Sequence, residues 1–197
     1  MPNEYKAPNS AWAFNVDSTQ NWAYQDNFFS VEQCKKIIEI GEGQILDRAK
    51  VAQEEAGWSR DSKVAWLYPS PEYDWIYRAV TDGVMTINNS FFNFDLFGLI
   101  EGFQFTRYDA PSGFYGMHID KILGGSIRKL SITIQLSSPE DYDGGELALQ
   151  IGSDPLIMPK EQGKLVCFPS YVLHEVRPVT RGTRYSLVAW VTGKPFK

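Results

Sequence analysis

A chain of 197 residues can bury a hydrophobic core without disulfides or a structural metal, so its length predicts a single domain. A net charge of −5 and a pI near 5.1 argue against the positive field that nucleic-acid binding requires. The sequence shows no secretory signal and no apolar run that could cross a bilayer, and Cys34 and Cys167 lack zinc-binding or CxxC spacing. We therefore expect a cytoplasmic protein with two reduced, buried thiols and neither nucleic-acid nor membrane partners.

The domain plan follows from a change in pattern near residue 95. Residues 1–20 are rich in Asn, Ser and Pro and have no hydrophobic period, so we expect an N-terminal arm. Residues 21–197 are expected to form one domain, with helical support at about 28–92 and a jelly-roll core at about 97–193.

Two helices are predicted in the first half of this domain. Ser30 and Gln33 have the spacing of a capping box, and apolar residues follow at helical intervals, which predicts a helix at about 31–42. The same periodicity predicts a second helix at about 71–91. Residues 43–62 are polar and mixed, consistent with a strand that leads into a mobile loop.

After residue 95 the chain has short alternating segments separated by Gly, Pro, Asp and Ser, which is typical of strands. We expect eight strands, within 99–109, 114–120, 129–137, 145–152, 154–159, 163–170, 173–179 and 183–193. The predicted fold class is mainly β, in an α+β arrangement: a double-stranded β-helix, or cupin-like jelly roll, with the N-terminal helices packed outside.

One expected strand alternates between apolar and polar side chains. In "KLSITIQLS", Ser131, Thr133 and Gln135 share one face, and apolar residues share the other. The polar face meets either solvent on an open sheet or the interior of a barrel that holds a polar small molecule.

The two histidines of the chain suggest a metal site. His118 and Asp120 are two residues apart, so on an extended segment their side chains leave the same face. His174 lies on another expected strand, and two imidazoles with one carboxylate can occupy one face of an octahedron, as in non-haem Fe(II) oxygenases. The HxD spacing alone is a weak signal, and either histidine alone is more often a surface or hydrogen-bonded residue.

Arg184 begins a strongly apolar strand ten residues after His174. A buried arginine needs an anionic partner, and its planar fork suits a carboxylate. Two alternatives are a protein acid such as Glu175 or an exposed position, as we expect for Arg177 and Arg181.

The chain from roughly 99 to 191 resembles the Fe(II)/2-oxoglutarate-dependent dioxygenases, within them the prolyl 4-hydroxylase-like branch, and especially bacterial and phage PKHD-type hydroxylases. The resemblance rests on "YDAPSGFYGMHID", "RKLSITIQLSSPEDYDGGELAL" and "GKLVCFPSYVLHEVRPVTRGTRYSLVAWV", in this order and spacing. The segment "FFSVEQCKKII" resembles the N-terminal support of this group more loosely. The resemblance implies Fe(II), 2-oxoglutarate and dioxygen, with ascorbate as a candidate reductant.

The same resemblance implies roles for individual residues. His118, Asp120 and His174 would be the metal ligands, and Arg184 would grip the distal carboxylate of 2-oxoglutarate. These four would form the catalytic set. Tyr108 corresponds to a tyrosine that lines the co-substrate pocket in relatives, although packing through its ring is an alternative.

Two further positions bear on the co-substrate, and two glycines have a structural role. Ser186 follows Arg184 on the same strand face and is a second candidate for the carboxylate. Gln135 stands where related hydroxylases often carry a tyrosine, and its amide can donate a similar hydrogen bond, with an open effect on 2-oxoglutarate affinity. Gly144 and Gly145 in "YDGGEL" are expected to serve a tight turn or bulge.

The resemblance implies hydroxylation of an unactivated C–H bond, with release of succinate and carbon dioxide, and favours a prolyl residue in a peptide or protein. Residues 43–70 and 109–116 are expected to form loops over such a substrate. Trp58, Trp66 and Tyr115 are candidate contacts, with core packing favoured for Trp66. Two other classes stay open: a hydroxylase of small molecules that uses the same metal site, and a non-catalytic jelly-roll binding module.

Overall fold

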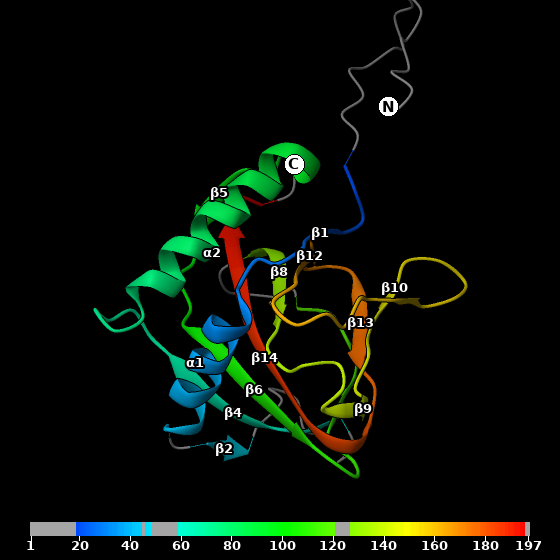
Figure 1. The fold of residues 1–197 in the computed structure, drawn as a ribbon. Coiled ribbons are helices and arrows are strands. Elements are labelled where there is room, and N and C mark those ends of the chain that lie inside the picture. Colours follow the sequence, from blue (N-terminus) through cyan, green and yellow to red (C-terminus); the bar gives the residue numbers. More distant parts are fainter. Residues whose placement is uncertain (1–18, 45, 49–58, 121–126, 196–197) are drawn as a thin grey trace, which may run out of the picture.

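The computed structural model describes residues 19–44, 46–48, 59–120 and 127–195, and they form two β-sheets with two α-helices against the larger one (Figure 1). In order, the larger sheet contains β1 (Ala23–Gln25), β12 (Leu165–Pro169), β8 (Arg128–Gln135), β14 (Val179–Gly193), β6 (Phe103–Asp109), β4 (Lys63–Leu67) and β2 (Asp47–Arg48), and both β5 (Leu96–Gly98) and β9 (Tyr142–Gly144) pair with β14. The smaller sheet contains β11 (Leu156–Ile157), β10 (Leu147–Gln150), β13 (Leu173–Val176), β7 (Phe114–His118) and β3 (Arg60–Asp61). This architecture confirms the predicted mainly β jelly roll with helices outside.

The first helix, α1 (Val31–Glu42), confirms the prediction from the capping box. Ser30 Oγ accepts from the backbone N–H of Gln33, and the Gln33 side chain accepts from the backbone N–H of Ser30. Its buried face includes Ile37 and the Cys34 thiol, whose pKa burial raises to about 11. Burial also raises the pKa of Cys167, so both thiols are protonated and structural, as expected.

The second helix, α2 (Asp74–Ile87), begins later than the hydrophobic period predicted. Residues 71–73 form a turn because the chain enters through Pro71, and Tyr73 provides no side-chain cap. The helix then widens into a π-helical turn, η1 (Asn88–Phe92), so the helical stretch ends close to the predicted residue 91.

All eight predicted strands are present, and the last is longer than expected because β14 begins at Val179. Six further strands are present in the described residues: β2 and β3 fall within residues 43–62, where one strand was expected, and β1, β4, β5 and β9 were not predicted. The expected mobile loop at 49–58 and most of the N-terminal arm lie outside the described residues. No helix among the described residues combines the length and apolarity needed to cross a membrane.

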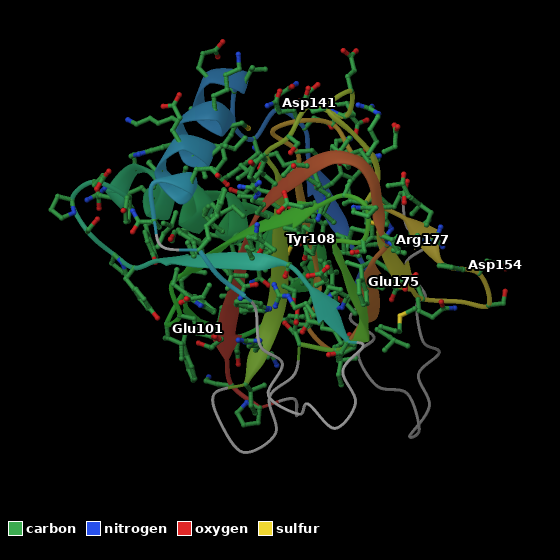
Figure 2. The ribbon with its side chains drawn as sticks, turned by 90° about the horizontal axis from the view of Figure 1, so that it is seen from below. Glu101, Tyr108, Asp141, Asp154, Glu175 and Arg177 are labelled. Carbon is green, nitrogen blue, oxygen red and sulfur yellow. The ribbon has the colours of Figure 1, made fainter. Side chains whose placement is uncertain are left out.

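Two hydrophobic clusters explain the alternation along β8. Leu130, Ile132 and Ile134 pack with α1 and α2 in the cluster beneath the helices. A second cluster, around Tyr108 and Phe168, lies on the other face of the larger sheet, against the smaller sheet. Figure 2 shows Tyr108 near the middle of the view and Glu175, Arg177 and Asp154 toward its rim. The polar face of β8 therefore points into the barrel interior, the second of the two readings that the sequence left open.

Candidate metal centre

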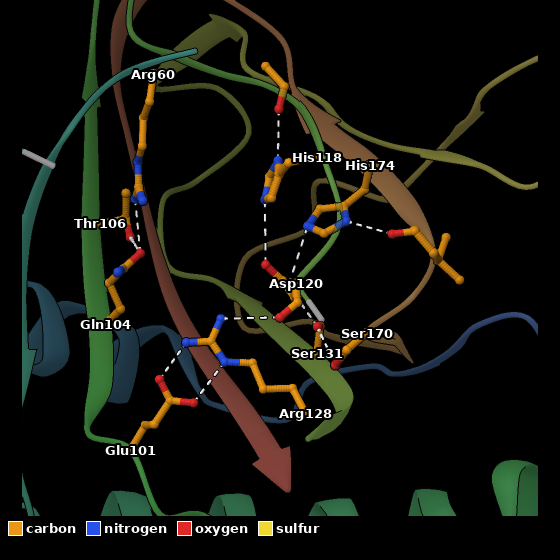
Figure 3. A network of polar contacts seen from close by, with 12 residues as sticks. Arg60, Glu101, Gln104, Thr106, His118, Asp120, Arg128, Ser131, Ser170 and His174 are labelled. Carbon is orange, nitrogen blue, oxygen red and sulfur yellow. Dashed lines mark hydrogen bonds and ion pairs between the residues drawn. The ribbon is translucent and has the colours of Figure 1, made fainter. Parts of the chain in front are cut away.

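Two neighbouring strands bring the histidines together. His118 on β7 and His174 on β13 are direct partners in the antiparallel register, and Asp120 lies two residues beyond the end of β7. The backbone N–H of Asp120 donates to Ser170 O at 3.0 Å, which turns the aspartate toward the same point. Nε2 of His118 lies 3.5 Å from Asp120 Oδ1, and Nε2 of His174 lies 3.5 Å from Oδ2 (Figure 3).

Each imidazole is oriented by a main-chain carbonyl. His118 Nδ1 donates to Gly116 O at 2.7 Å, and His174 Nδ1 donates to Val172 O at 2.8 Å. Because each Nδ1 carries the proton, each Nε2 presents its lone pair to the common point. Burial also lowers the pKa of His174, which favours the neutral imidazole, the form that binds a metal.

Asp120 is buried and held by hydroxyl groups. Ser131 Oγ donates to Asp120 Oδ2 at 2.7 Å and lies 2.9 Å from Ser170 Oγ. Burial alone would raise the pKa of Asp120, but its close contacts with His118 and His174 and the Ser131 hydrogen bond together hold this pKa below its usual value. The carboxylate is therefore charged and fixed in orientation.

The chemistry of this donor set fits a divalent metal such as Fe(II). The ligand atoms of His118, Asp120 and His174 lie within 4.8 Å of one another, the one such cluster among the residues that the structure describes. Two neutral imidazoles and one carboxylate on a single side leave the opposite positions of an octahedron for other ligands. The geometry thus brings together all three metal ligands predicted from the sequence.

Arg184 on β14 is almost completely buried, with 1% of its surface exposed. Its Nη2 donates to Gln135 Oε1 at 2.9 Å, and its guanidinium lies 5.3 Å from the centroid of the Tyr108 ring. Within the part of the chain that the structure describes, Nε and Nη1 of Arg184 and the buried Oγ of Ser186 have no hydrogen-bond partner. A carboxylate satisfies such donors, so this end of the barrel fits the distal carboxylate of 2-oxoglutarate.

The alternative acid for Arg184 is engaged elsewhere. Glu175 Oε1 lies 3.4 Å from Nε of Arg177, and Arg181 pairs with Asp143 at 2.6 Å. Among the described residues, no carboxylate is within ion-pair distance of Arg184. Gly144 and Gly145 have φ values of 73° and 63°, which supports their predicted turn role next to this arginine.

A cavity connects the metal cluster with the surrounding aromatic residues. It is lined by the cluster and by Arg60, Gln104, Tyr108, Tyr115, Ser131, Thr133, Leu147, Phe168, Val176, Val188 and Trp190. Tyr115 stacks on His118 with ring centroids 3.5 Å apart.

Trp66 is 37% exposed, stacks on Tyr68 and lies beside Trp190. The expected core packing of Trp66 is therefore wrong, because its strand, β4, lies near the edge of the sheet. Trp58 lies outside the described residues.

Sequence reasoning missed several residues of this site. Arg128 is paired through two nitrogens with Glu101, and its guanidinium lies 3.9 Å from the Trp190 ring centroid, which fixes one wall of the cavity (Figure 3). Tyr142 interacts with Arg184, although burial, the larger effect, raises the pKa of its hydroxyl. The only sequence feature that could have indicated these residues was a polar group in or beside an apolar strand. Such a feature does not identify the partner of the polar group.

Comparison with known proteins shows what the strand region of this chain is similar to. The model of the 2OG-Fe(II) oxygenase superfamily matches residues 103–192. A PKHD-type hydroxylase of Sphingopyxis alaskensis is 35% identical over 130 residues, which cover 64% of this chain and 59% of that relative. The chain thus spans less than two thirds of the length of this relative.

Two solved structures have the same fold. A prolyl-4-hydroxylase of Pseudomonas putida has a TM-score of 0.72 at 23% identity, over 89% of this chain and 94% of that one. A prolyl hydroxylase in complex with a hypoxia inducible factor peptide fragment, from Trichoplax adhaerens, has a TM-score of 0.71 at 18% identity, over 88% and 84%. Residues 103–192 therefore match the model of the 2OG-Fe(II) oxygenase superfamily, and the chain is similar in sequence to PKHD-type hydroxylases and in fold to prolyl hydroxylases.

Proposed function

We propose that this chain is an Fe(II)- and 2-oxoglutarate-dependent dioxygenase that hydroxylates an unactivated C–H bond, with a prolyl residue of a peptide or protein as its preferred substrate. The observation that carries the proposal is the pairing of a three-residue metal cluster with a buried arginine whose Nε and Nη1 have no hydrogen-bond partner among the described residues. The first group suits Fe(II), and the second suits the carboxylate of a keto acid.

In this proposal His118, Asp120 and His174 hold the metal, and Arg184 holds the far carboxylate of 2-oxoglutarate. The bound iron supplies the oxidising chemistry, in which oxidative decarboxylation to succinate and carbon dioxide accompanies hydroxylation. Arg184 fixes the direction in which the keto acid lies, because its guanidinium is anchored by Gln135. Ser186 and Tyr108 complete this pocket, and ascorbate is the proposed reductant.

The apolar walls of the barrel exclude water from the reacting groups. Phe168 packs edge-on against His174 with ring centroids 4.8 Å apart, and Leu147 and Val176 line the same cavity. Exclusion of water lowers the local dielectric constant, which strengthens the interaction between Arg184 and an anionic co-substrate and limits side reactions.

The rings beside the cavity support a prolyl substrate. Trp66 and Tyr68 stack at 6.4 Å, and Trp66 lies 6.1 Å from Trp190 at the cavity wall. Partly exposed aromatic faces suit the ring of a proline and the extended backbone of a Pro-containing peptide. The solved relative that holds a peptide fragment adds weight to this choice.

The direct test is turnover of 2-oxoglutarate. Purified protein with Fe(II), ascorbate and dioxygen should convert 2-oxoglutarate to succinate, faster when a Pro-containing peptide pool is added, with a mass increase of about 16 Da on the product expected for hydroxylation. A screen of small metabolites in parallel separates the alternative small-molecule hydroxylase from the peptide hydroxylase. Failure to bind either Fe(II) or Mn(II) would leave the non-catalytic binding module as the better description.

A substitution next to the cluster tests the role of the hydroxyls around Asp120. Ser131→Ala removes the 2.7 Å bond to Asp120 Oδ2 and should weaken Mn(II) binding about tenfold, because groups that orient a metal ligand contribute about 10–100-fold to affinity. Electron paramagnetic resonance of free Mn(II) measures this change. Ser153→Ala, at an exposed loop residue, is the control and should leave the affinity unchanged. Unchanged binding in Ser131→Ala would show that Asp120 needs no hydroxyl support.

A further inference from the structure

Carboxylate partners divide the arginines of this chain into two groups. Among those whose side chains the structure describes, five lie within ion-pair distance of a carboxylate: Arg78, Arg107, Arg128, Arg177 and Arg181. Arg60 and Arg184 have no such partner among the described residues. Arg184 lies against Tyr108 and Arg60 lies against Tyr115, and both tyrosines line the cavity of the metal cluster.

Arg60 is held in place by neutral groups. Its Nη2 donates to Gln104 Oε1 at 2.9 Å (Figure 3). Its Nε donates to Ser62 Oγ at 2.7 Å. Its guanidinium also lies 4.3 Å from the Tyr115 ring centroid, and the same ring stacks on His118. These contacts fix the side chain without neutralising its charge.

The nearest acid along the chain is directed elsewhere. Asp61 follows Arg60 on β3, so its side chain leaves the opposite face of the strand, where Oδ2 accepts from Ser112 Oγ at 3.1 Å. Arg60 is half-buried and lines the cavity itself. A half-buried guanidinium with unused N–H groups is best satisfied by a carboxylate, which can accept two parallel hydrogen bonds.

We propose that Arg60 binds a carboxylate of the molecule to be hydroxylated, so the substrate of this site is anionic near the C–H bond that reacts. This inference rests on the proposed function and adds the substrate class to it. Arg184 then serves the carboxylate of the co-substrate, while Arg60 serves that of the substrate. The carboxylate belongs either to the free α-carboxyl group of a small amino acid derivative or C-terminal residue, or to an acidic side chain next to the target residue.

Matched ligand pairs test this proposal and separate the two sources. The first pair is N-acetyl-L-proline and N-acetyl-L-prolinamide, and the second is acetyl-Asp-Pro-amide and acetyl-Asn-Pro-amide. Each is titrated, without oxygen, into protein loaded with Mn(II) and 2-oxoglutarate, and the relaxation of ligand protons by Mn(II) reports binding close to the metal. We expect the anionic member of one pair to bind at least about tenfold more tightly than its amide. The pair that shows the difference identifies the source.

Two variants connect the preference to Arg60. Arg60→Gln should abolish the difference within the pair. Gln104→Glu should abolish it as well while keeping Arg60 in place, because the new carboxylate occupies the guanidinium from inside the protein. Arg181→Gln is the control, since it removes the same charge from an exposed residue that pairs with Asp143, and it should retain the preference.

The outcomes distinguish this inference from the proposed function. Absence of Mn(II) binding would refute the proposed function itself. Normal binding of Mn(II) and 2-oxoglutarate, with equal affinities within both pairs or with no detectable binding of any member, would overturn the role of Arg60 alone. Retention of the preference in both Arg60→Gln and Gln104→Glu would also overturn it, provided that thermal unfolding shows both variants to be folded.

Discussion

His174→Ala is expected to reduce 2-oxoglutarate turnover to the level of metal-free protein and to weaken Mn(II) binding by about 100-fold or more. Loss of a metal ligand lowers metal affinity more than loss of a residue that only orients a ligand. His174 supplies one of three ligand atoms, and the two that remain, on His118 and Asp120, lie two positions apart in one segment. Two such groups hold a divalent ion far less well than a rigid set of three from two strands.

The variant should remain folded, which makes the result informative. His174 lies in a short strand whose backbone bonds to β7 and β10 are independent of its side chain. Succinate formation and Mn(II) titration provide the readouts, and thermal unfolding of the metal-free protein provides the check. Leu173→Ala, at an exposed neighbour, is the control and should keep its affinity for Mn(II). Substantial turnover by a folded His174→Ala variant would remove the basis of the metal assignment.

Arg184→Met should have a different signature, with metal binding retained and the 2-oxoglutarate concentration for half-maximal turnover raised by about 100-fold. The guanidinium does not touch the metal cluster, so the metal ligands keep their positions. What the variant loses is the charged partner of the co-substrate. Arg177→Met, at a partly exposed residue paired with Glu175, should leave this concentration unchanged.

The same variant carries a prediction for stability. In the absence of co-substrate, Arg184 is a buried cation whose Nε and Nη1 find no hydrogen-bond partner in the described part of the chain, and such a group destabilises the fold. The free energy of unfolding of metal-free Arg184→Met should therefore be no lower than that of the parent protein. An increase of up to about 3 kcal/mol is expected. Added 2-oxoglutarate should raise the melting temperature of the metal-loaded parent and not that of the variant. A variant that is both less stable and unchanged in turnover would point to a structural arginine.

Local patterns in the sequence predicted the parts of the fold that depend on neighbouring residues. The capping box at Ser30 located the start of α1, and the alternation along β8 identified a polar face, although it did not decide between solvent and the barrel interior. The metal cluster could be predicted for a related reason, because His118 and Asp120 form a short motif and the sequence contains only one other histidine.

The contacts that the sequence could not supply join distant residues. Ser131 and Ser170 meet across 39 positions, and Arg60 reaches Gln104 across 44. Neither residue type has a spacing rule that identifies such a partner. The exposure of Trp66 was missed for a similar reason, because it depends on where β4 lies in the sheet and not on the apolar run around it.

The main-chain acceptors of the two imidazoles limit how this centre can change over evolution. Replacing Gly116 or Val172 by another residue alters a side chain but leaves the carbonyl that receives the Nδ1 proton. The main chain of these segments thus sets the tautomer of both histidines, and point mutations at the acceptor residues do not change it. Natural variation in metal affinity or redox behaviour would have to act through the carboxylate side of the cluster, where hydroxyl side chains can be gained or lost one at a time.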